Sequence, residues 1–354
     1  MPIETAQVAA TAGAMHPVAV RRIYRLAAGS ALSLVVSQVM GISLPFVAPV
    51  LTFLLLGLPV PAPGLKKGLG FVIALIVPML GATFMLPFLE HARWAGIGLV
   101  TLALFYTFYF TARGGPAVLG TFMTIGITVV VTIGSVNTVI LMNLIQAFAA
   151  NALVGVGFVW VAHWLLPDLP GTPVLPKPPK AAPDYRKAGR SAIRSLLVVL
   201  PLVLLFLFSS ASAAYTPVMI KVASMGQQAT VESSRSIGLS LLESTWWGGV
   251  AAMLAWCLLT AWPSIIMFTL LTLLAGLVFG RFVFSGIAVN PDFSKWTYAF
   301  VTMLVLIGPA VTDSPLSDGV SFGMRLWLFM VIAVYGTVAV RVFDAFFKPE
   351  SNDD

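Results

Sequence analysis

Two ionisable residues, Glu243 and Lys221, stand inside apolar stretches of this sequence. Glu243 follows Arg235 by eight residues, which on a helix rising about 1.5 Å per residue places it about 12 Å further along. Charged groups inside membrane helices are costly, and those that occur commonly mark ion or proton pathways. Glu243 is therefore our first candidate for proton coupling or substrate contact. The alternative is a structural partner for a nearby cation.

Lys221 falls in the middle of a predicted span, at the position that aligns with Phe53 in the first half of the chain. An ammonium at that depth could pair with Glu243 or hold an anionic substrate. The following run, Ser224 to Thr230, is polar, so the lysine could instead extend to the inner membrane surface.

Asn143, Gln146 and Asn151 share one stretch and fall within a stripe about 140° wide on a helix. They could line a polar path, or they could form hydrogen bonds between helices. Trp246 and Trp247, just after Glu243, could stack on an aromatic substrate, with core packing as the alternative.

Basic residues open the third predicted helix of each half, Lys66 and Lys67 in the first and Arg235 in the second. Gly70 and Gly238 follow them and would let another helix approach closely. The cations could form a cytoplasmic vestibule for organic anions. They would also be required simply to orient the helices.

On the opposite face, Asp313, Asp318 and Arg325 border the last predicted loop. This loop could dock a periplasmic partner, although ordinary solvated charges explain it equally well.

No sequence feature indicates an enzyme. Phosphate-binding loops, nucleophile elbows and metal-ligand spacings are absent, and His16, His91 and His163 are far apart. Cys257 is the only cysteine and cannot form an intramolecular disulfide. We expect no catalytic residues, metal or cofactor.

The elements that must position these residues are transmembrane helices. Of 354 residues, 59% are hydrophobic and 9% are charged, and the mean hydropathy is +0.97, which no water-soluble fold could bury. We predict an all-α polytopic membrane protein with about twelve transmembrane helices. The predicted spans are 26–44, 45–60, 68–89, 94–111, 117–134, 138–166, 193–210, 213–227, 237–259, 262–280, 296–312 and 320–345.

Charge predicts the orientation. With both termini in the cytoplasm, all of the 20 Lys and Arg except Arg93 and Arg325 lie inside or at inner ends of spans. Because these cations are scattered between apolar spans, we do not expect nucleic-acid binding.

The two halves resemble each other. An offset of 168 residues superposes the first four spans on spans seven to ten, which predicts two parallel six-helix repeats. The predicted divisions are a short cytoplasmic segment 1–20, repeats at 21–167 and 186–347, a proline-rich cytoplasmic linker 168–185, and a cytoplasmic tail 348–354. The aligned pairs include Arg22 with Arg190, Pro49 with Pro217, Lys67 with Arg235, Gly70 with Gly238, Trp94 with Trp262 and Arg113 with Arg281.

The layout resembles the fusaric acid resistance and aromatic acid exporter (FUSC-like) superfamily of bacterial inner-membrane proteins. The resemblance rests on the basic start Arg21-Arg22-x-x-Arg25, the prolines of span two (Pro45, Pro49), and the basic-x-x-Gly opening of span three. It implies proton-driven export of small organic anions, often aromatic carboxylates or xenobiotics, together with a periplasmic adaptor (membrane fusion) protein. Large members carry a soluble domain between the halves, where this chain has only the proline-rich linker.

Three functions compete at this point. The first is a proton-coupled secondary exporter of small organic anions, the second a passive anion channel. The third is an accessory membrane subunit of an envelope export complex. Besides the lipid bilayer, the expected partners are the anion and the adaptor, and a homo-oligomer is left open.

Overall fold

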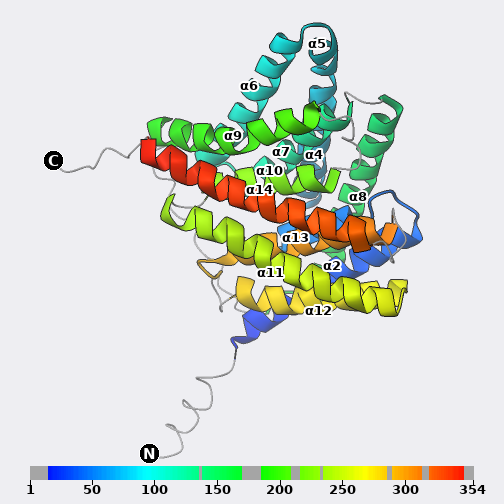
Figure 1. The fold of residues 1–354 in the computed structure, drawn as a ribbon. Helices are drawn as coiled ribbons and strands as arrows, with labels where there is room; N and C mark the ends of the chain where they lie inside the picture. Colours follow the sequence, from blue (N-terminus) through cyan, green and yellow to red (C-terminus); the bar gives the residue numbers. More distant parts are fainter. Residues whose placement is uncertain are drawn as a thin grey trace, which may run out of the picture.

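The chain folds into a bundle of packed α-helices (Figure 1). The computed structural model describes residues 15–134, 138–169, 185–208, 216–231, 234–284, 289–312 and 319–346. Thirteen helical segments occur in these ranges: α2 (Pro17–Val39), α3 (Val47–Leu56), α4 (Leu65–Thr83), α5 (Leu86–His91), α6 (Arg93–Ala112), α7 (Ala117–Gly134), α8 (Thr138–Leu165), α9 (Tyr185–Leu207), α10 (Thr216–Val231), α11 (Ser234–Ala261), α12 (Ile265–Val283), α13 (Phe293–Thr312) and α14 (Gly319–Phe346).

A helix occupies the place of each of the twelve predicted spans, with α4 and α5 together in the third place. The bounds of α7 are those predicted. The predictions for α2 and α9 were wrong at their starts, because both helices begin about eight or nine residues earlier, at Pro17 and Tyr185. Pro17 is well placed in a first turn, where its missing N–H costs no hydrogen bond, and His16 caps that turn by accepting from the Val18 N–H at 3.3 Å.

Eight helical stretches in the described residues are long and apolar enough to cross a membrane. The chain is therefore a multi-pass membrane protein whose surroundings include the lipid bilayer. Among the remaining helices, α2 contains three arginines, α3 has only 10 residues, and α10 has 16 residues with a lysine and two glutamines. The eight stretches are α4 with α5, α6, α7, 139–165 of α8, α9, α12, 293–311 of α13, and 321–346 of α14.

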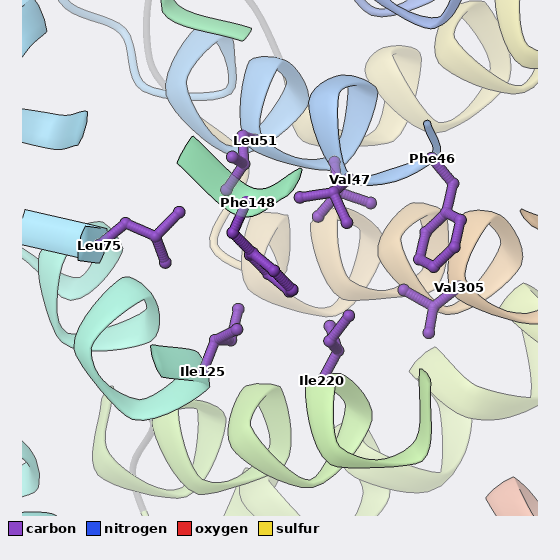
Figure 2. A pocket seen from close by; sticks show the side chains of 9 residues that line it. Phe46, Val47, Leu51, Leu75, Ile125, Phe148, Ile220 and Val305 are labelled. Carbon is purple, nitrogen blue, oxygen red and sulfur yellow. The ribbon is translucent and has the colours of Figure 1, made fainter. Parts of the chain in front are cut away.

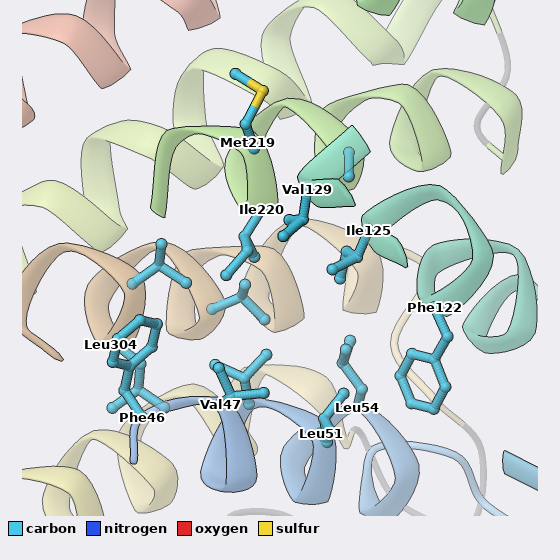
Figure 3. Packing of buried hydrophobic residues seen from close by; sticks show 14 of the residues in the cluster. Phe46, Val47, Leu51, Leu54, Phe122, Ile125, Val129, Met219, Ile220 and Leu304 are labelled. Atoms are coloured by element: carbon cyan, nitrogen blue, oxygen red, sulfur yellow. The ribbon is translucent and has the colours of Figure 1, made fainter. Parts of the chain in front are cut away.

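The centre of the bundle is where α3, α7, α10 and α13 meet (Figure 3). Every residue of α3 is buried, and α7 is buried along nearly its whole length. Phe53 of α3 stacks on Phe300 of α13 with ring centroids 3.8 Å apart. Figure 3 shows apolar side chains from the four helices converging, among them Val47, Ile125, Ile220 and Leu304. The central helices are therefore fixed by close apolar packing.

Helices from the two halves also pack on each other. The helix α12 lies against α2, and α6 lies against α9. In the first of these contacts, a Cβ added to Gly276 would lie 2.8 Å from the Ala27 Cα, and Gly280 faces Ile23 and Leu26. Glycines spaced by four residues let the two backbones approach, which is the way membrane helices gain contact without a hydrophobic driving force.

The outer surface of the bundle is apolar. Large side chains such as Phe84, Trp94 and Ile266 are more than two-thirds exposed. A soluble monomer rarely presents such a surface, whereas lipid tails cover it at no cost.

Candidate functional site

Lys221 is buried in the middle of the bundle. It lies in α10, its relative exposure is 1%, and its Nζ donates to the Thr302 Oγ1 of α13 at 2.8 Å. Within the described parts of the chain no carboxylate pairs with it. Burying an ammonium group costs several kcal/mol of desolvation free energy unless an anion or several acceptors stabilise it. The single Thr302 hydroxyl satisfies only one of its three N–H donors.

The helix that carries Lys221 holds further buried polar groups. Gln227 Nε2 donates to the Thr124 Oγ1 of α7 at 2.8 Å, whereas its Oε1 has no partner within the described residues. Gln228 is fully buried, and neither amide atom finds a partner in the described ranges. Lys221, Ser224 and Gln228 are spaced by three and four residues and so share one face of α10. Polar groups left without partners in an interior are rare and call for an explanation.

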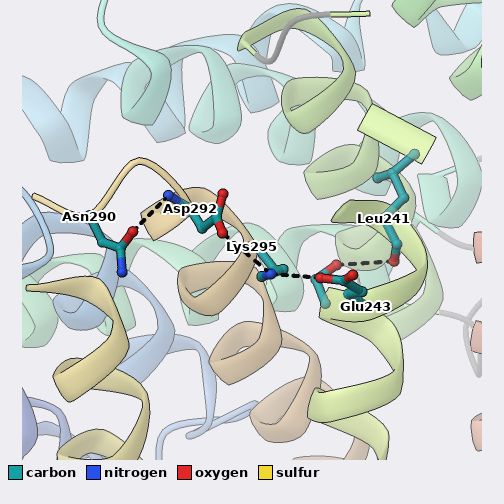
Figure 4. A network of polar contacts seen from close by, with 6 residues as sticks. Leu241, Glu243, Asn290, Asp292 and Lys295 are labelled. Atoms are coloured by element: carbon teal, nitrogen blue, oxygen red, sulfur yellow. Dashed lines mark hydrogen bonds and ion pairs between the residues drawn. The ribbon is translucent and has the colours of Figure 1, made fainter. Parts of the chain in front are cut away.

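Glu243 lies on α11 and belongs to a separate polar network (Figure 4). Its Oε2 accepts from the Lys295 Nζ of α13 at 2.6 Å, and Asp292 Oδ2 lies 3.6 Å from the same ammonium. The Glu243 side chain remains 44% exposed. The structural alternative for Glu243, a nearby cation, is thus Lys295. One of the alternatives for Lys221, a pair with Glu243, is not formed.

The three amides of α8 do not share one environment. Asn143 and Gln146 are exposed. Asn151 is fully buried and donates to Ser43 O at 2.9 Å and to Ala147 O at 2.8 Å, and its Oδ1 accepts from the Ser37 hydroxyl. Asn151 therefore ties α8 to the end of α2 and the turn after it.

The two tryptophans after Glu243 face outward, with Trp246 56% and Trp247 47% exposed. Trp247 contacts Trp296 of α13 with ring centroids 6.1 Å apart. Neither ring is enclosed by the bundle, so any stacking substrate would meet them at its outer surface.

The basic residues Lys66 and Lys67 are exposed at the start of α4. Arg235 and Gly238 belong to the first turns of α11, and their surroundings lie outside the described residues. A Cβ added at Gly70 would meet nothing within 4 Å, so no helix approaches at that glycine. The close approach occurs one half-turn earlier, at Gly68, where a Cβ would meet the ring of Trp160 from α8.

The predicted docking loop is only partly described. Asp313 and Asp318 lie outside the described residues, as does most of the linker, 170–184. Arg325 is half-buried and donates from Nε to Ser321 O at 3.2 Å within α14.

Sequence reasoning missed two ion pairs. Arg25 of α2 donates to Asp168, just after α8, at 2.8 Å, and Arg194 of α9 lies 3.8 Å from Asp344 near the end of α14. The available signal was an aspartate near the end of the sixth span of each predicted half, matched to an arginine near the start of the first span.

A small cavity among α3, α4, α7, α8, α10 and α13 is lined only by apolar side chains (Figure 2). Leu75, Phe148 and Val305 point into it together with residues of the central helices. It offers no group that could bind an ion or orient a polar ligand.

One comparison with known proteins found a match, which covers most of the first half of the chain. A family model described as "Protein of unknown function (DUF2955)" matches residues 22–162, from the start of α2 to the last turn of α8. No curated protein matches the chain. No solved structure matches it.

Proposed function

We propose that this protein is a secondary transporter that exports small organic anions, and that Lys221 contacts the anion within the membrane. The observation that carries the proposal is the buried ammonium of Lys221, which has a hydroxyl partner at 2.8 Å and no carboxylate partner among the described residues. A negatively charged substrate would supply the missing countercharge.

A repeated architecture supports transport. Each buried residue of α9 lies 169 positions after a buried residue of α2, for example Ala188 after Ala19 and Phe206 after Ser37. For α6 and α12 the offset is 168, as in Val100 with Phe268 and Phe108 with Gly276. The offset of 169 between α2 and α9 is one residue longer than the offset of 168 predicted for the first four spans.

The packing partners correspond in the same way. The contact of α2 with α12 matches that of α9 with α6, and the pairing of α4 with α7 matches that of α11 with α13. The family match, which ends within the last turns of α8, also treats the first six spans as one unit. These correspondences support two parallel six-helix repeats, an arrangement in which transporters place the substrate between the halves.

The resemblance to FUSC-like exporters extends the proposal to a bacterial inner membrane, both termini in the cytoplasm, an aromatic or other carboxylate substrate, and a periplasmic adaptor. Glu243 remains the candidate proton carrier, and Lys295 is the cation that its protonation would release. Lys66 and Lys67, exposed at the start of α4, are the described cations of the proposed vestibule.

The test is substrate-dependent proton flux in proteoliposomes containing the purified chain, screened over aromatic and aliphatic carboxylates. We expect saturable flux that Lys221→Met abolishes and Lys221→Arg partly restores. The matched control is Lys67→Met, which removes an exposed cation. Glu243→Gln should leave anion exchange intact and remove its dependence on the proton gradient.

Other outcomes would overturn the proposal. Unitary anion currents in planar bilayers, without counterflow, would indicate the passive channel. Absence of flux for every anion, with or without the adaptor, would indicate an accessory subunit of an envelope complex. Unchanged flux in Lys221→Met would remove Lys221 from the substrate path.

A further inference from the structure

A second pocket opens where α3 ends and where α7 and α13 begin. Its cavity volume is about 70 Å³. Leu54, Gly57 and Leu58 line it from α3 and the segment after it, and Ala117, Val118 and Thr121 from α7. The helix α13 contributes Phe293, Ser294, Thr297 and Tyr298.

Hydroxyl groups occupy the inner wall of this pocket. Thr121 Oγ1 and Tyr298 Oη are 3.4 Å apart. Thr297 is 6% exposed, and its hydroxyl has no hydrogen-bond partner in the described parts of the chain. A buried hydroxyl without a partner is able to donate to an incoming acceptor, and the adjacent rings of Phe293 and Tyr298 suit an apolar body.

The helix α13 connects the pocket with the partner of Lys221. Thr302, which accepts from the Lys221 Nζ, lies one turn beyond Tyr298 on α13 and donates to the Tyr298 carbonyl at 2.7 Å. The buried cation is therefore one helical turn deeper than the hydroxyl wall.

The two halves differ beside this pocket. Gly57 ends α3, and Pro59 and Pro61 prevent its continuation, whereas α10 continues past Gly226 to Gln227 and Gln228. Gly226 lies 169 positions after Gly57, the offset found for the first helices. Gln227 fills the space beside Gly120, where an added Cβ would lie 2.9 Å from its Oε1. In the first half, the corresponding space beside Gly57 belongs to the pocket.

We propose that this pocket is a binding site for the carboxylate-bearing substrate before it reaches Lys221. The carboxylate accepts from the Thr297 hydroxyl, and the apolar body lies against Leu58, Val118 and the ring of Phe293. The inference rests on the proposed transport function, but it concerns binding and can be measured without flux.

The experiment uses the single cysteine of the chain. In the full chain, Cys257→Ala gives a background without thiols, and Ser294→Cys then places one thiol in the pocket while keeping the Thr297 hydroxyl. An anionic methanethiosulfonate is added to membrane vesicles of either orientation, with and without benzoate. We expect one orientation to react, and benzoate at ten times its Kd to slow the reaction about tenfold. Thr269→Cys, exposed on α12, is the control that benzoate should not protect.

A second test uses a substitution that fills part of the pocket. Ala117→Phe should narrow the half-open mouth and weaken protection by benzoate, whereas Ala95→Phe on the outer face of α6 should not. A Ser294→Cys thiol that is unreactive from both sides, or that reacts but is not protected by benzoate or cyclohexanecarboxylate, would overturn the site even where flux is present. Protection in a chain that transports nothing would keep the site and end the transport proposal.

Discussion

At the scale of single residues, the two intramembrane charges differ in their surroundings. Lys221 is enclosed by the central helices and has one hydroxyl partner. Glu243 is nearly half exposed and pairs with Lys295, which also lies close to Asp292. Removing the charge of a half-exposed pair changes stability little. Removing the charge of the buried Lys221 should remove a desolvation cost.

The ion pair of Glu243 and Lys295 gives the first prediction. A double-mutant cycle with Glu243→Gln and Lys295→Met should yield a coupling free energy below about 1 kcal/mol in detergent, because the carboxylate is 44% exposed. The cycle is measured from unfolding in mixed micelles. A coupling several times larger would mean that the pair is desolvated and structural.

Asn151 gives the second prediction. Asn151→Ala should lower the free energy of unfolding by about 1–3 kcal/mol, because it leaves the buried Ser37 hydroxyl and the Ser43 carbonyl without their partner. Gln146→Ala, on the exposed side of the same helix, should change it by less than about 0.5 kcal/mol. Equal effects of both substitutions would contradict the assignment of their faces.

The sequence could identify Glu243, Lys221 and Asn151 as unusual, but not which neighbours they meet. In a chain with apolar residues on all sides of each helix, periodicity gives little information about rotation, because lipid and protein interior are equally apolar. The partners Thr302 and Lys295 come from α13, more than fifty residues away, and no local pattern predicts them.

At the scale of helices, a pair of glycines in α4 gives the third prediction. Gly68→Ala should lower the melting temperature, since the added methyl meets the ring of Trp160, whose Nε1 donates to Pro63 O at 2.7 Å. Gly70→Ala should be neutral or slightly stabilising, because it meets open space and improves helix propensity. Destabilisation by Gly70→Ala in lipid but not in detergent would reveal an intermolecular contact at that glycine.

Helix positions were more predictable than helix starts. Long apolar runs bounded by Gly and Pro placed α7 and α6 almost residue by residue. The predicted spans start after Arg25 and Arg190, whereas α2 and α9 already begin at Pro17 and Tyr185 and include those arginines. Arg25 and Arg194 lie within regular turns and pair with aspartates at the ends of α8 and α14.

At the scale of the whole molecule, the two halves depend on each other through the contacts of α2 with α12 and α6 with α9. The fourth prediction is that the chain, divided within 170–184 and expressed as two polypeptides together, yields a complex that copurifies. Either half alone should aggregate or be degraded, because small-residue faces such as Gly276 and Gly280 would lack their partner. Monodisperse single halves would show that each is an independent domain.

The contact between α2 and α12 also has a consequence for biosynthesis. The helix α2 ends at Val39 and α12 begins at Ile265, so the ribosome must add 226 further residues before the partner exists. At about 5–20 residues per second this takes roughly 10–45 s. Throughout that interval Ile23, Leu26 and Ala27 of α2 lack the helix face against which they finally pack. An insertase or chaperone that shields the first helix would therefore determine how much of the newly made chain survives.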